Sequence, residues 1–305
     1  MCLVKNTIFV LVMFEINGGI FISSQLDESI IQLKLFTELD MNDPFEINKN
    51  NIPEAPIHAD CPIEILIHGW RGSSDSDWLT KMKDRLLEVG CNNVIVVDWG
   101  QLADSPYAAA VSNVSITGEY IGKVLISLAN KKGVQMEKIR IRGFSLGGHV
   151  AGFIGKTIIS ETGTKVGRIT GLDPAGPSFR LVAPKLRLAK DDALFTDIIH
   201  TDGRKLGTTR AIGNVDFYPN GGSFQSCSLI PFLINTCSHN RAHEYFTESI
   251  QSEKFIATAC NSYKSFQNGR CSDGRKVIMG YHLDTNVKSG KYYLMTNSYP
   301  PYARG

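Results

Sequence analysis

The stretch KIRIRGFSLGGHVAGFIGK, residues 138–156, decides how this chain is expected to fold. Residues 138–144 form a short isoleucine-rich run typical of a strand, and the small and apolar residues that follow are typical of a helix. Gly143, Ser145 and Gly147 stand at the junction in the pattern G-x-S-x-G. A strand that turns directly into a helix strains the residue at the turn, and side chains at the flanking glycines would collide with the neighbouring strand and helix. The junction therefore predicts a serine that is held out from a sharp turn.

Four more short runs rich in isoleucine and valine follow the same pattern. They are IEILIHG (63–69), VIVVDWG (94–100), ITGLDP (169–174) and TDIIHTD (196–202). Such runs are typical of strands buried on both faces of a parallel sheet. Segments with helical spacing, 78–90 and 115–133, lie between them. This alternation predicts an α/β fold with a central, mostly parallel sheet flanked by helices. No linker divides residues 25–305, so we interpret them as one domain.

In this setting, G-x-S-x-G is the nucleophile elbow of the α/β-hydrolase fold, which makes Ser145 the candidate nucleophile. The N–H groups at the start of the following helix carry partial positive charge, so the Leu146 N–H is one candidate donor of an oxyanion hole. The second donor is expected from an early loop after a strand, and the Trp70 N–H in IHGWRG is our candidate. We interpret His68 as a residue that orders this loop rather than as a base.

A serine hydroxyl needs a general base, and in this fold an acid and then a histidine follow the serine along the chain. Asp173 is the candidate acid because it follows a strand-like run and precedes a turn; the alternative is a residue that only caps the loop. The histidines beyond it are His200, His239, His243 and His282. His200 lies within a strand-like run and is interpreted as structural. His239 is expected where a helix begins, and His243, one turn further on, stays an alternative base.

The chain has nearly balanced charge and a distinct N-terminus. Its formal net charge of +2 gives no electrostatic reason to expect a nucleic-acid partner. Lys5 precedes the apolar run IFVLVMF (8–14), and small residues follow, which predicts a secretory signal peptide over residues 1–24 although Glu15 interrupts it. A buried N-terminal strand is the alternative. The run is too short to cross a bilayer, so we expect a secreted protein without a transmembrane anchor.

The cysteine count supports export. The chain has seven cysteines, and removal of a signal peptide would remove Cys2 and leave six, an even number. Six cysteines allow fifteen pairings, and the alternative is six free thiols in a cytosolic protein. Because short loops close easily, we expect the pairs Cys227–Cys237 and Cys260–Cys271, which leaves Cys61 with Cys91.

Six stretches together resemble the pancreatic lipase family of animal lipases over residues 63–250. They are IHGW, VIVVDW, GFSLGGHVAG, GLDPAGP, VDFYPNGG and CSHNRAHEYFTESI, and YYLMTN is similar to the end of that family's catalytic domain. The resemblance implies hydrolysis of lipid esters at a lipid–water interface without a cofactor. It places the nucleophile on Ser145, the acid on Asp173, the base on His239, and the oxyanion donors on Trp70 and Leu146.

The sequence departs from the vertebrate digestive members of that family in ways that concern the substrate. Those members carry a C-terminal β-sandwich domain, which we do not expect here, and no colipase-type partner is expected either. Their lid is long, whereas only SLIPFLINT separates Cys227 from Cys237, and the loop 203–214 is also short. Short versions of both loops resemble the phospholipase A1 branch, including insect enzymes. Arg204, Lys205 and Arg210 could meet a phosphate, although a solvated loop is the alternative.

We therefore expect a phospholipase A1 that releases the sn-1 fatty acid. One alternative is a lipase with the same triad that acts on triacylglycerol or galactolipid. Another, of a different class, is a lipid-binding protein without catalysis, similar to insect yolk proteins.

No metal is expected, and one glycosylation sequon is present. His239 and His243 would suit zinc, but Asn240 stands where the zinc-protease motif has Glu. The calcium site of some relatives maps near residues 187–193, where two ligand positions fall on Pro184 and Ala189, which have no side-chain oxygen. Asn113, Val114 and Ser115 form a glycosylation sequon, with the alternative that the sequon lies in a helix and goes unused.

Overall fold

A central sheet organises the molecule. The computed structural model describes residues 10–16, 19–25, 28–227 and 236–305, and within these ranges eleven strands form one sheet in the order β12-β11-β13-β10-β9-β8-β7-β5-β6-β3-β4. The strands are β3 (Gln32–Phe36), β4 (Phe45–Ile47), β5 (Ile63–Ile67), β6 (Asn93–Asp98), β7 (Ile139–Phe144), β8 (Arg168–Leu172), β9 (Phe195–Ile199), β10 (Val215–Pro219), β11 (Ile256–Ala259), β12 (Lys276–Ile278) and β13 (Gly290–Leu294). Each predicted run overlaps one of these strands, and β6, β8 and β9 begin one residue before their runs.

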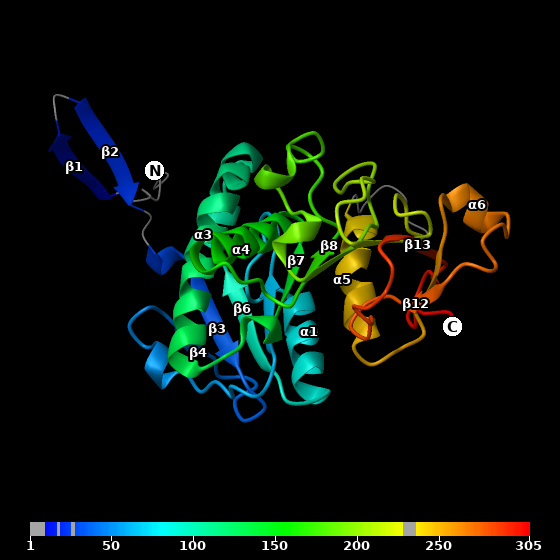
Figure 1. Cartoon of the computed structure of the whole chain (residues 1–305), viewed down its shortest axis with the longest axis horizontal. Helices are drawn as coiled ribbons and strands as arrows, with labels where there is room; N and C mark the ends of the chain where they lie inside the picture. Colours follow the sequence, from blue (N-terminus) through cyan, green and yellow to red (C-terminus); the bar gives the residue numbers. More distant parts are fainter. Residues whose placement is uncertain (1–9, 17–18, 26–27, 228–235) are drawn as a thin grey trace, which may run out of the picture.

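The middle of the sheet is parallel, as predicted. All neighbouring strands from β6 across β5, β7, β8, β9 and β10 to β13 pair in parallel, and the antiparallel strands lie at the two sides. Every residue of β5, β8 and β9 is buried, which is the pattern of strands covered on both faces. Because parallel strands place their carboxyl ends at one edge, the loops after β5, β7, β8, β9 and β10 meet there (Figure 1).

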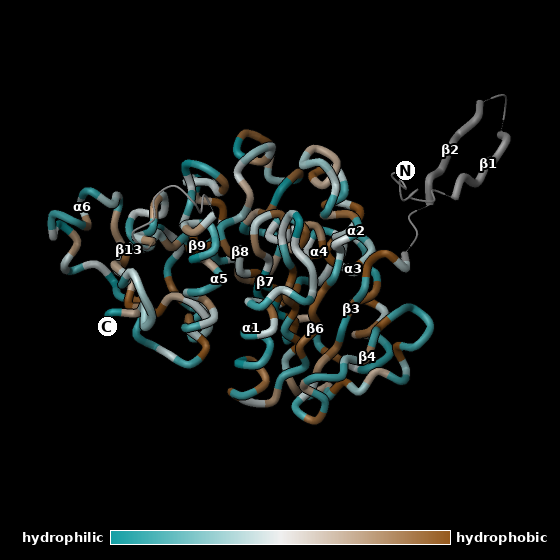
Figure 2. The backbone as a smooth tube through the Cα atoms, turned by 180° about the vertical axis from the view of Figure 1, so that it is seen from behind, coloured by the Kyte–Doolittle hydropathy of each residue, from teal (hydrophilic) through white to brown (hydrophobic). Residues whose placement is uncertain are grey.

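Helices cover both faces of the sheet, so the α/β-hydrolase fold class is confirmed (Figure 1). The helices are α1 (Asp77–Glu88), α2 (Gly100–Ala103), α3 (Tyr107–Lys132), α4 (Leu146–Thr162), α5 (Cys237–Ser249) and α6 (Tyr263–Gln267). Ile65 of β5 belongs to the apolar cluster under α3 and α4, whereas the adjacent Leu66 belongs to the cluster under α1 and α5. In Figure 2 hydrophobic positions concentrate in the central strands, while the segment around α6 is largely hydrophilic. Within the described ranges, no helix is long and apolar enough to cross a membrane.

Helix α3 begins earlier than the sequence indicated. The pattern predicted a helix over 115–133, but α3 starts at Tyr107, directly after Pro106. Alanines at 108–110 extend the helix because they favour helical backbone without contributing a long apolar stripe. Asn113 consequently lies inside α3, and its side-chain Nδ2 donates to the Leu102 carbonyl at 3.2 Å. A glycan on Asn113 would require this hydrogen bond to be lost.

The N-terminal strands stand apart from the main sheet. β1 (Val10–Ile16) and β2 (Gly19–Gln25) pair with each other in an antiparallel hairpin, and neither belongs to the eleven-stranded sheet of the described chain (Figure 1). The burial of their side chains is not described, so the alternative of a buried N-terminal strand is not tested. Part of the segment 1–24 lies outside the described residues, and the signal peptide stays a prediction.

The three expected disulfides are confirmed. Cys61 pairs with Cys91, Cys227 with Cys237, and Cys260 with Cys271. The first bridge joins the residues that precede β5 and β6, two neighbouring parallel strands. The second bridge joins the loop after β10 to the first residue of α5.

Candidate active site

Ser145 occupies the sharp turn between β7 and α4. Its backbone has φ 56° and ψ −119°, a conformation that residues with a side chain rarely adopt. A Cβ on Gly143 would lie 2.1 Å from the Gly147 carbonyl oxygen, and a Cβ on Gly147 would lie 2.5 Å from the His68 carbonyl oxygen. Neither contact is sterically possible, so both positions require glycine. The strand, turn and helix together present Ser145 at the carboxyl edge of the sheet.

Asp173 and His239 form a buried hydrogen-bonded pair. His239 Nδ1 lies 2.6 Å from Asp173 Oδ2, and both side chains are shielded from solvent. The backbone N–H of Thr201 donates to Asp173 Oδ1 at 2.9 Å, and the N–H of Asp202 donates to Oδ2 at 3.1 Å. These contacts leave the carboxylate one orientation, with one oxygen directed at the imidazole.

Backbone contacts bring Ser145 to the same place. Its N–H donates to the Leu172 carbonyl at 3.1 Å, and its carbonyl accepts from the Ala175 N–H at 3.2 Å. Ser145 is therefore bonded to the chain both just before and just after Asp173. The ring of Phe144, which directly precedes Ser145, lies 4.6 Å from the ring of His239. The structure thus gathers the predicted nucleophile, acid and base from three separate segments.

The two candidate oxyanion donors flank Ser145. Leu146 is the first residue of α4, and the first N–H groups of a helix have no partner within it. The loop after β5 approaches from the other side, because a Cβ on Gly69 would lie only 2.8 Å from the Ser145 Cβ. This approach places the backbone that leads into Trp70 beside the serine. The Trp70 side chain turns away, and its Nε1 donates to the Ser105 carbonyl at 2.8 Å.

His68 holds that loop in place. Its Nδ1 lies 2.9 Å from the Gly69 carbonyl oxygen, and its Nε2 accepts from the Trp99 backbone N–H at 3.2 Å. The Trp99 indole returns a hydrogen bond to the His68 carbonyl at 2.9 Å. Both ring nitrogens of His68 are occupied, which agrees with the interpretation that it orders the loop.

The other histidines make contacts that do not suit a general base. His243 stacks on Trp78 with ring centroids 4.7 Å apart, and burial, with the nearby charges of His239 and Arg241, lowers its pKa to about 3. His200 lies between the Asp216 carboxylate, at 2.8 Å, and the Thr208 carbonyl, at 2.6 Å. His282 contacts the Ile250 carbonyl at 3.0 Å. Of the four candidate histidines, His239 is the only one with a hydrogen bond to Asp173 in the described part of the chain.

The sequence profile of the Lipase family matches residues 20–302. The chain belongs to the lipase family. It is 37% identical to phospholipase A1 of Vespa crabro over 252 residues, which cover 79% of this chain and 83% of the hornet protein. It is 34% identical to hepatic triacylglycerol lipase of Mus musculus, with coverage of 82% of this chain and 54% of that protein. Lipoprotein lipase of Bos taurus is 36% identical, with coverage of 78% and 55%.

Membership in the lipase family makes this protein a carboxylic ester hydrolase that acts on lipids. The resemblance to animal lipases drawn from the sequence motifs is confirmed, and so is the expected α/β-hydrolase fold. The chain spans most of the hornet relative but only about half the length of the two mammalian ones.

His149 ties the helix of the lipase elbow to the loop after Asp173. Its Nε2 lies 2.9 Å from the Ala175 carbonyl oxygen, and its Nδ1 accepts from the Leu188 N–H at 3.1 Å. Its ring stacks on Phe179 with centroids 3.7 Å apart. Burial lowers the pKa of His149 to about 3, so the ring stays neutral and can accept the second hydrogen bond.

The Lys156 ammonium group binds the Asp192 carboxylate in the segment to which the calcium site of some relatives maps. Lys156 Nζ donates to both oxygens of Asp192, at 2.6 and 2.5 Å, and to the Arg187 carbonyl at 2.8 Å. The Ala189 N–H donates to Asp192 Oδ2 at 2.8 Å. A side chain of α4 thus supplies the positive charge to which this loop is bound.

The predicted lid falls largely outside the described residues. Residues 228–235 are not described, so the structure does not test the prediction that this segment forms a short lid. What is described is the Cys227–Cys237 bridge at its base, and Cys237 precedes His239 by two residues at the start of α5. The disulfide therefore joins one end of the predicted lid to the helix that carries His239, the candidate general base.

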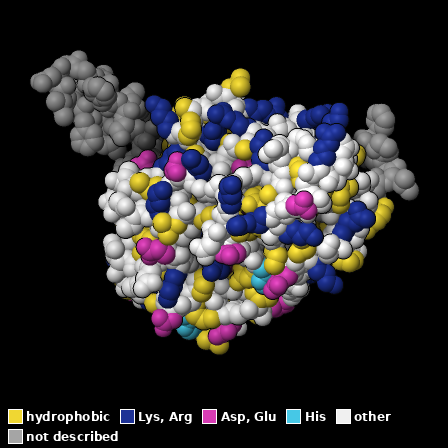
Figure 3. Space-filling view, turned by 45° about the vertical axis from the view of Figure 1, so that its right-hand side comes forward, with side chains coloured by type: hydrophobic (Ala, Val, Ile, Leu, Met, Phe, Trp, Pro, Cys, Tyr) yellow, Lys and Arg dark blue, Asp and Glu magenta, His cyan; other side chains and the backbone are white. Residues whose placement is uncertain are grey.

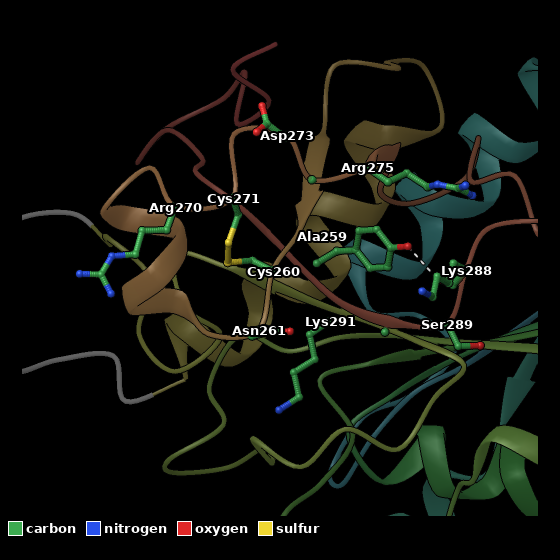
Figure 4. Close-up of a pocket in the computed structure, with 13 residues that line it drawn as sticks. Ala259, Cys260, Asn261, Arg270, Cys271, Asp273, Arg275, Lys288, Ser289 and Lys291 are labelled. Carbon is green, nitrogen blue, oxygen red and sulfur yellow. Dashed lines mark hydrogen bonds between the residues drawn. A yellow bond between two sulfur atoms is a disulfide. The ribbon is translucent and has the colours of Figure 1, made fainter.

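A cavity in the C-terminal part of the lipase lies away from these groups. It has a volume of about 390 Å³ and opens where β13 begins, beside the Cys260–Cys271 bridge (Figure 4). Arg275, Lys288 and Lys291 are among its lining residues. Ser145, Asp173 and His239 are not among the residues that line it, so this cavity is separate from the candidate active site.

Sequence reasoning missed several residues that shape the site. It predicted Ser145, Asp173 and His239 but not the amide donors of Thr201 and Asp202, which hold the candidate acid in place. The run TDIIHTD could have indicated them, because residues at the end of a strand next to β8 must lie near the end of β8. Their backbone role leaves no mark in residue type.

Proposed function

We propose that this lipase is a secreted phospholipase A1 that releases the sn-1 fatty acid through a triad of Ser145, His239 and Asp173. The observation that carries the proposal is the 2.6 Å contact of His239 Nδ1 with the buried Asp173, beside a serine with φ 56°. A histidine whose Nδ1 is held by a carboxylate directs its Nε2 away from that carboxylate, toward the serine and the substrate. Backbone strain such as that of Ser145 concentrates at functional turns.

The chemistry follows from the position of each group. Ser145 Oγ attacks the ester carbonyl carbon while His239 Nε2 takes the hydroxyl proton, and Asp173 stabilises the imidazolium that forms. The N–H groups of Trp70 and Leu146 hold the carbonyl oxygen as it gains negative charge. The tetrahedral intermediate collapses, and the proton passes from His239 to the leaving glycerol oxygen. Water, activated by His239, then hydrolyses the acyl-serine and frees the fatty acid.

Preference for phospholipid rests on the loops around the serine and on one relative. The chain aligns with 83% of a protein named phospholipase A1. Only nine residues separate Cys227 from Cys237, and a short lid leaves room at the mouth for a bulky, charged head group. Export is supported by three disulfides, because such bridges persist in oxidising compartments.

Triacylglycerol hydrolysis is the second candidate. The mouse and bovine relatives named as triacylglycerol and lipoprotein lipases are 34% and 36% identical to this chain. The same triad would act on either lipid, so the substrate is decided by the loops and not by the catalytic groups.

The test uses disulfide-intact protein and its Ser145→Ala variant. Both receive phosphatidylcholine with different sn-1 and sn-2 acyl chains, and triolein in parallel, and released fatty acids are identified by mass spectrometry. We expect the sn-1 acid from the wild type and a loss on the order of a millionfold in the variant.

Each other outcome has a defined meaning. Faster release from triolein would support the second candidate. Equal, low rates for both proteins on both lipids would sink the triad assignment and favour a lipid-binding protein without catalysis.

A further inference from the structure

Two loops at the carboxyl edge of the sheet carry an unusual charge. Residues 177–187, after β8, and residues 203–210, after β9, together contain six basic residues and no acidic one, in a chain whose net charge is only +2. We call these two loops the basic rim. Its basic residues are Arg180, Lys185, Arg187, Arg204, Lys205 and Arg210. Arg187 is buried, and the other five are partly or fully exposed.

Hydrogen bonds lock the two loops into one surface. Arg180 donates to the carbonyls of Lys205, at 2.5 Å, and Gly207, at 2.8 Å, and Arg210 donates to the Arg180 carbonyl at 3.2 Å. The Gly176 N–H donates to the Leu206 carbonyl at 2.7 Å. The rim therefore presents its charges from a fixed framework and not from two independent loops.

The rim lies beside the candidate active site. A Cβ on Gly207 would strike the Asp173 carboxylate, and a Cβ on Gly176 would strike the Gly207 carbonyl oxygen. On the far side, Tyr107 donates to the Pro177 carbonyl at 2.9 Å and packs edge-on against Trp70, which follows Gly69. The rim thus begins within a few residues of the serine's own surroundings.

Exposed apolar side chains accompany the charges. Leu181 is 96% exposed, Leu186 51% and Phe224, on the loop after β10, 70%. In Figure 3 the coloured side chains along the upper edge of the molecule are basic or hydrophobic, and this is the edge where the loops after β8 and β9 lie in Figure 1. Large apolar side chains that gather on one surface, next to polar residues, mark sites of contact with a protein or a membrane.

We propose that the basic rim is the surface on which this protein docks to anionic phospholipid interfaces, with Lys185 and Arg204 meeting lipid phosphates while Leu181 and Phe224 enter the acyl boundary. The inference rests on the proposed function, hydrolysis of a lipid, and adds that the lipid interface to which the protein binds is negatively charged. The apolar groups favour a lipid interface over a soluble polyanion, because a polyanion would satisfy the charges and leave Leu181 and Phe224 in water.

The docking test is a vesicle sedimentation assay that separates binding from catalysis. Ser145→Ala protein is mixed with vesicles of phosphatidylcholine alone or with about one third phosphatidylglycerol, and each Lys or Arg near such a surface is expected to add about fivefold to the partition coefficient. We expect binding to rise with phosphatidylglycerol and to fall at 1 M salt, where the Debye length is about 3 Å. The variant with Lys185→Glu and Arg204→Glu should lose at least 25-fold in partitioning.

A matched pair of substitutions controls for net charge. Lys81→Glu and Lys131→Glu change the charge equally on α1 and at the end of α3, away from the rim, and should leave partitioning within about twofold. Neither pair should change hydrolysis of a soluble short-chain ester by protein with Ser145 intact, because the substituted side chains do not contact Asp173 or His239.

Several results would overturn the inference. They are equal binding to both vesicle types, equal losses in both charge-reversal variants, or displacement from neutral and anionic vesicles alike by dextran sulfate. Full activity of the Ser145→Ala protein would instead refute the catalytic proposal and leave the sedimentation result standing on its own.

Discussion

Gly207 lies directly against the carboxylate of Asp173. A Cβ on residue 207 would be 2.3 Å from Asp173 Oδ1 and 2.6 Å from Oδ2, much closer than atoms can approach. The Gly207 N–H is itself fixed by a 3.0 Å hydrogen bond to the Asp202 carbonyl, so the loop cannot easily withdraw. Gly207, which is far from Ser145 in the sequence, therefore packs against the Asp173 carboxylate and limits its movement.

Gly207→Ala should consequently reduce activity without unfolding the protein. The added methyl group must displace either the loop or the carboxylate, and misplacement by about 1 Å can cost on the order of 100-fold in kcat. The measurement is kcat and KM on a soluble ester, with circular dichroism to establish that the variant is folded.

Gly163→Ala is the matched control for that experiment. Gly163 ends α4 with φ 70° and has open space around its Cα, so alanine should cost about 1 kcal/mol of stability through backbone strain alone. Its kcat should be unchanged. A Gly207→Ala protein that keeps wild-type kcat would show that Asp173 is not confined as described.

Stability should fall in mild acid because of His243. Burial lowers its pKa from 6.5 to about 3 in the folded protein. Below pH 6.5 the unfolded chain binds a proton that the folded chain excludes, so the free energy of unfolding decreases by about 1.4 kcal/mol per pH unit for this group. The loss begins near pH 6.5 and ends near pH 3.

His243→Phe should remove that part of the acid sensitivity. Nδ1 of His243 is buried without a hydrogen-bond partner in the described structure, so an apolar ring against Trp78 leaves no polar group unsatisfied. Urea denaturation at pH 6, 5 and 4 should give a shallower pH dependence for the variant than for the wild type. His149, whose pKa burial also lowers to about 3, should still contribute its own slope. Identical slopes in both proteins would contradict the assignment.

The Cys227–Cys237 bridge should matter for activity more than the Cys260–Cys271 bridge. Replacement of either pair by serine should cost about 3 kcal/mol, because each closes a loop of similar length. Only the first bridge anchors the start of α5, which carries His239. We expect kcat on a soluble ester to fall about tenfold for the first double variant and to stay level for the second, at a temperature where both are folded. Equal effects on kcat would count against a mechanical link to His239.

The partly exposed Lys156 and the buried Asp192 should behave as a coupled pair. Lys156→Met leaves the Asp192 carboxylate buried without its cation and should destabilise the fold by about 3 kcal/mol. A second change, Asp192→Asn, removes the stranded charge and keeps an oxygen for the Ala189 N–H. The double variant should therefore recover most of the loss in urea denaturation, and additive losses would refute the coupling.

Much of the fold could be predicted because its signals are local. The pattern around Ser145 predicts, within a few residues, a strand that turns directly into a helix. The apolar runs at 63–69 and 94–100 predict strands that are buried on both faces of the sheet. The cysteine pairs followed from loop length for the same reason. Helix α3 was predicted too short because the residues from Tyr107 onward lack the apolar spacing that marks a helix, although their backbone preference is helical.

The candidate site was only partly accessible from the sequence. His239 and His243 are both histidines on the first turns of one helix, and nothing in their own neighbourhood separates them. The structure distinguishes them because one ring lies 2.6 Å from Asp173 and the other is enclosed by Trp78 and Phe144.

The sequence alone determined which side chains could perform the chemistry and the turn that holds Ser145. Tertiary structure decided which of them meet: the Asp173 carboxylate, the amides of Thr201 and Asp202, and the close approach of Gly207 come together only because β8 and β9 are neighbours in the sheet. Local conformation depends on a few consecutive residues, whereas contacts between loops depend on the order in which the whole chain lays down its strands.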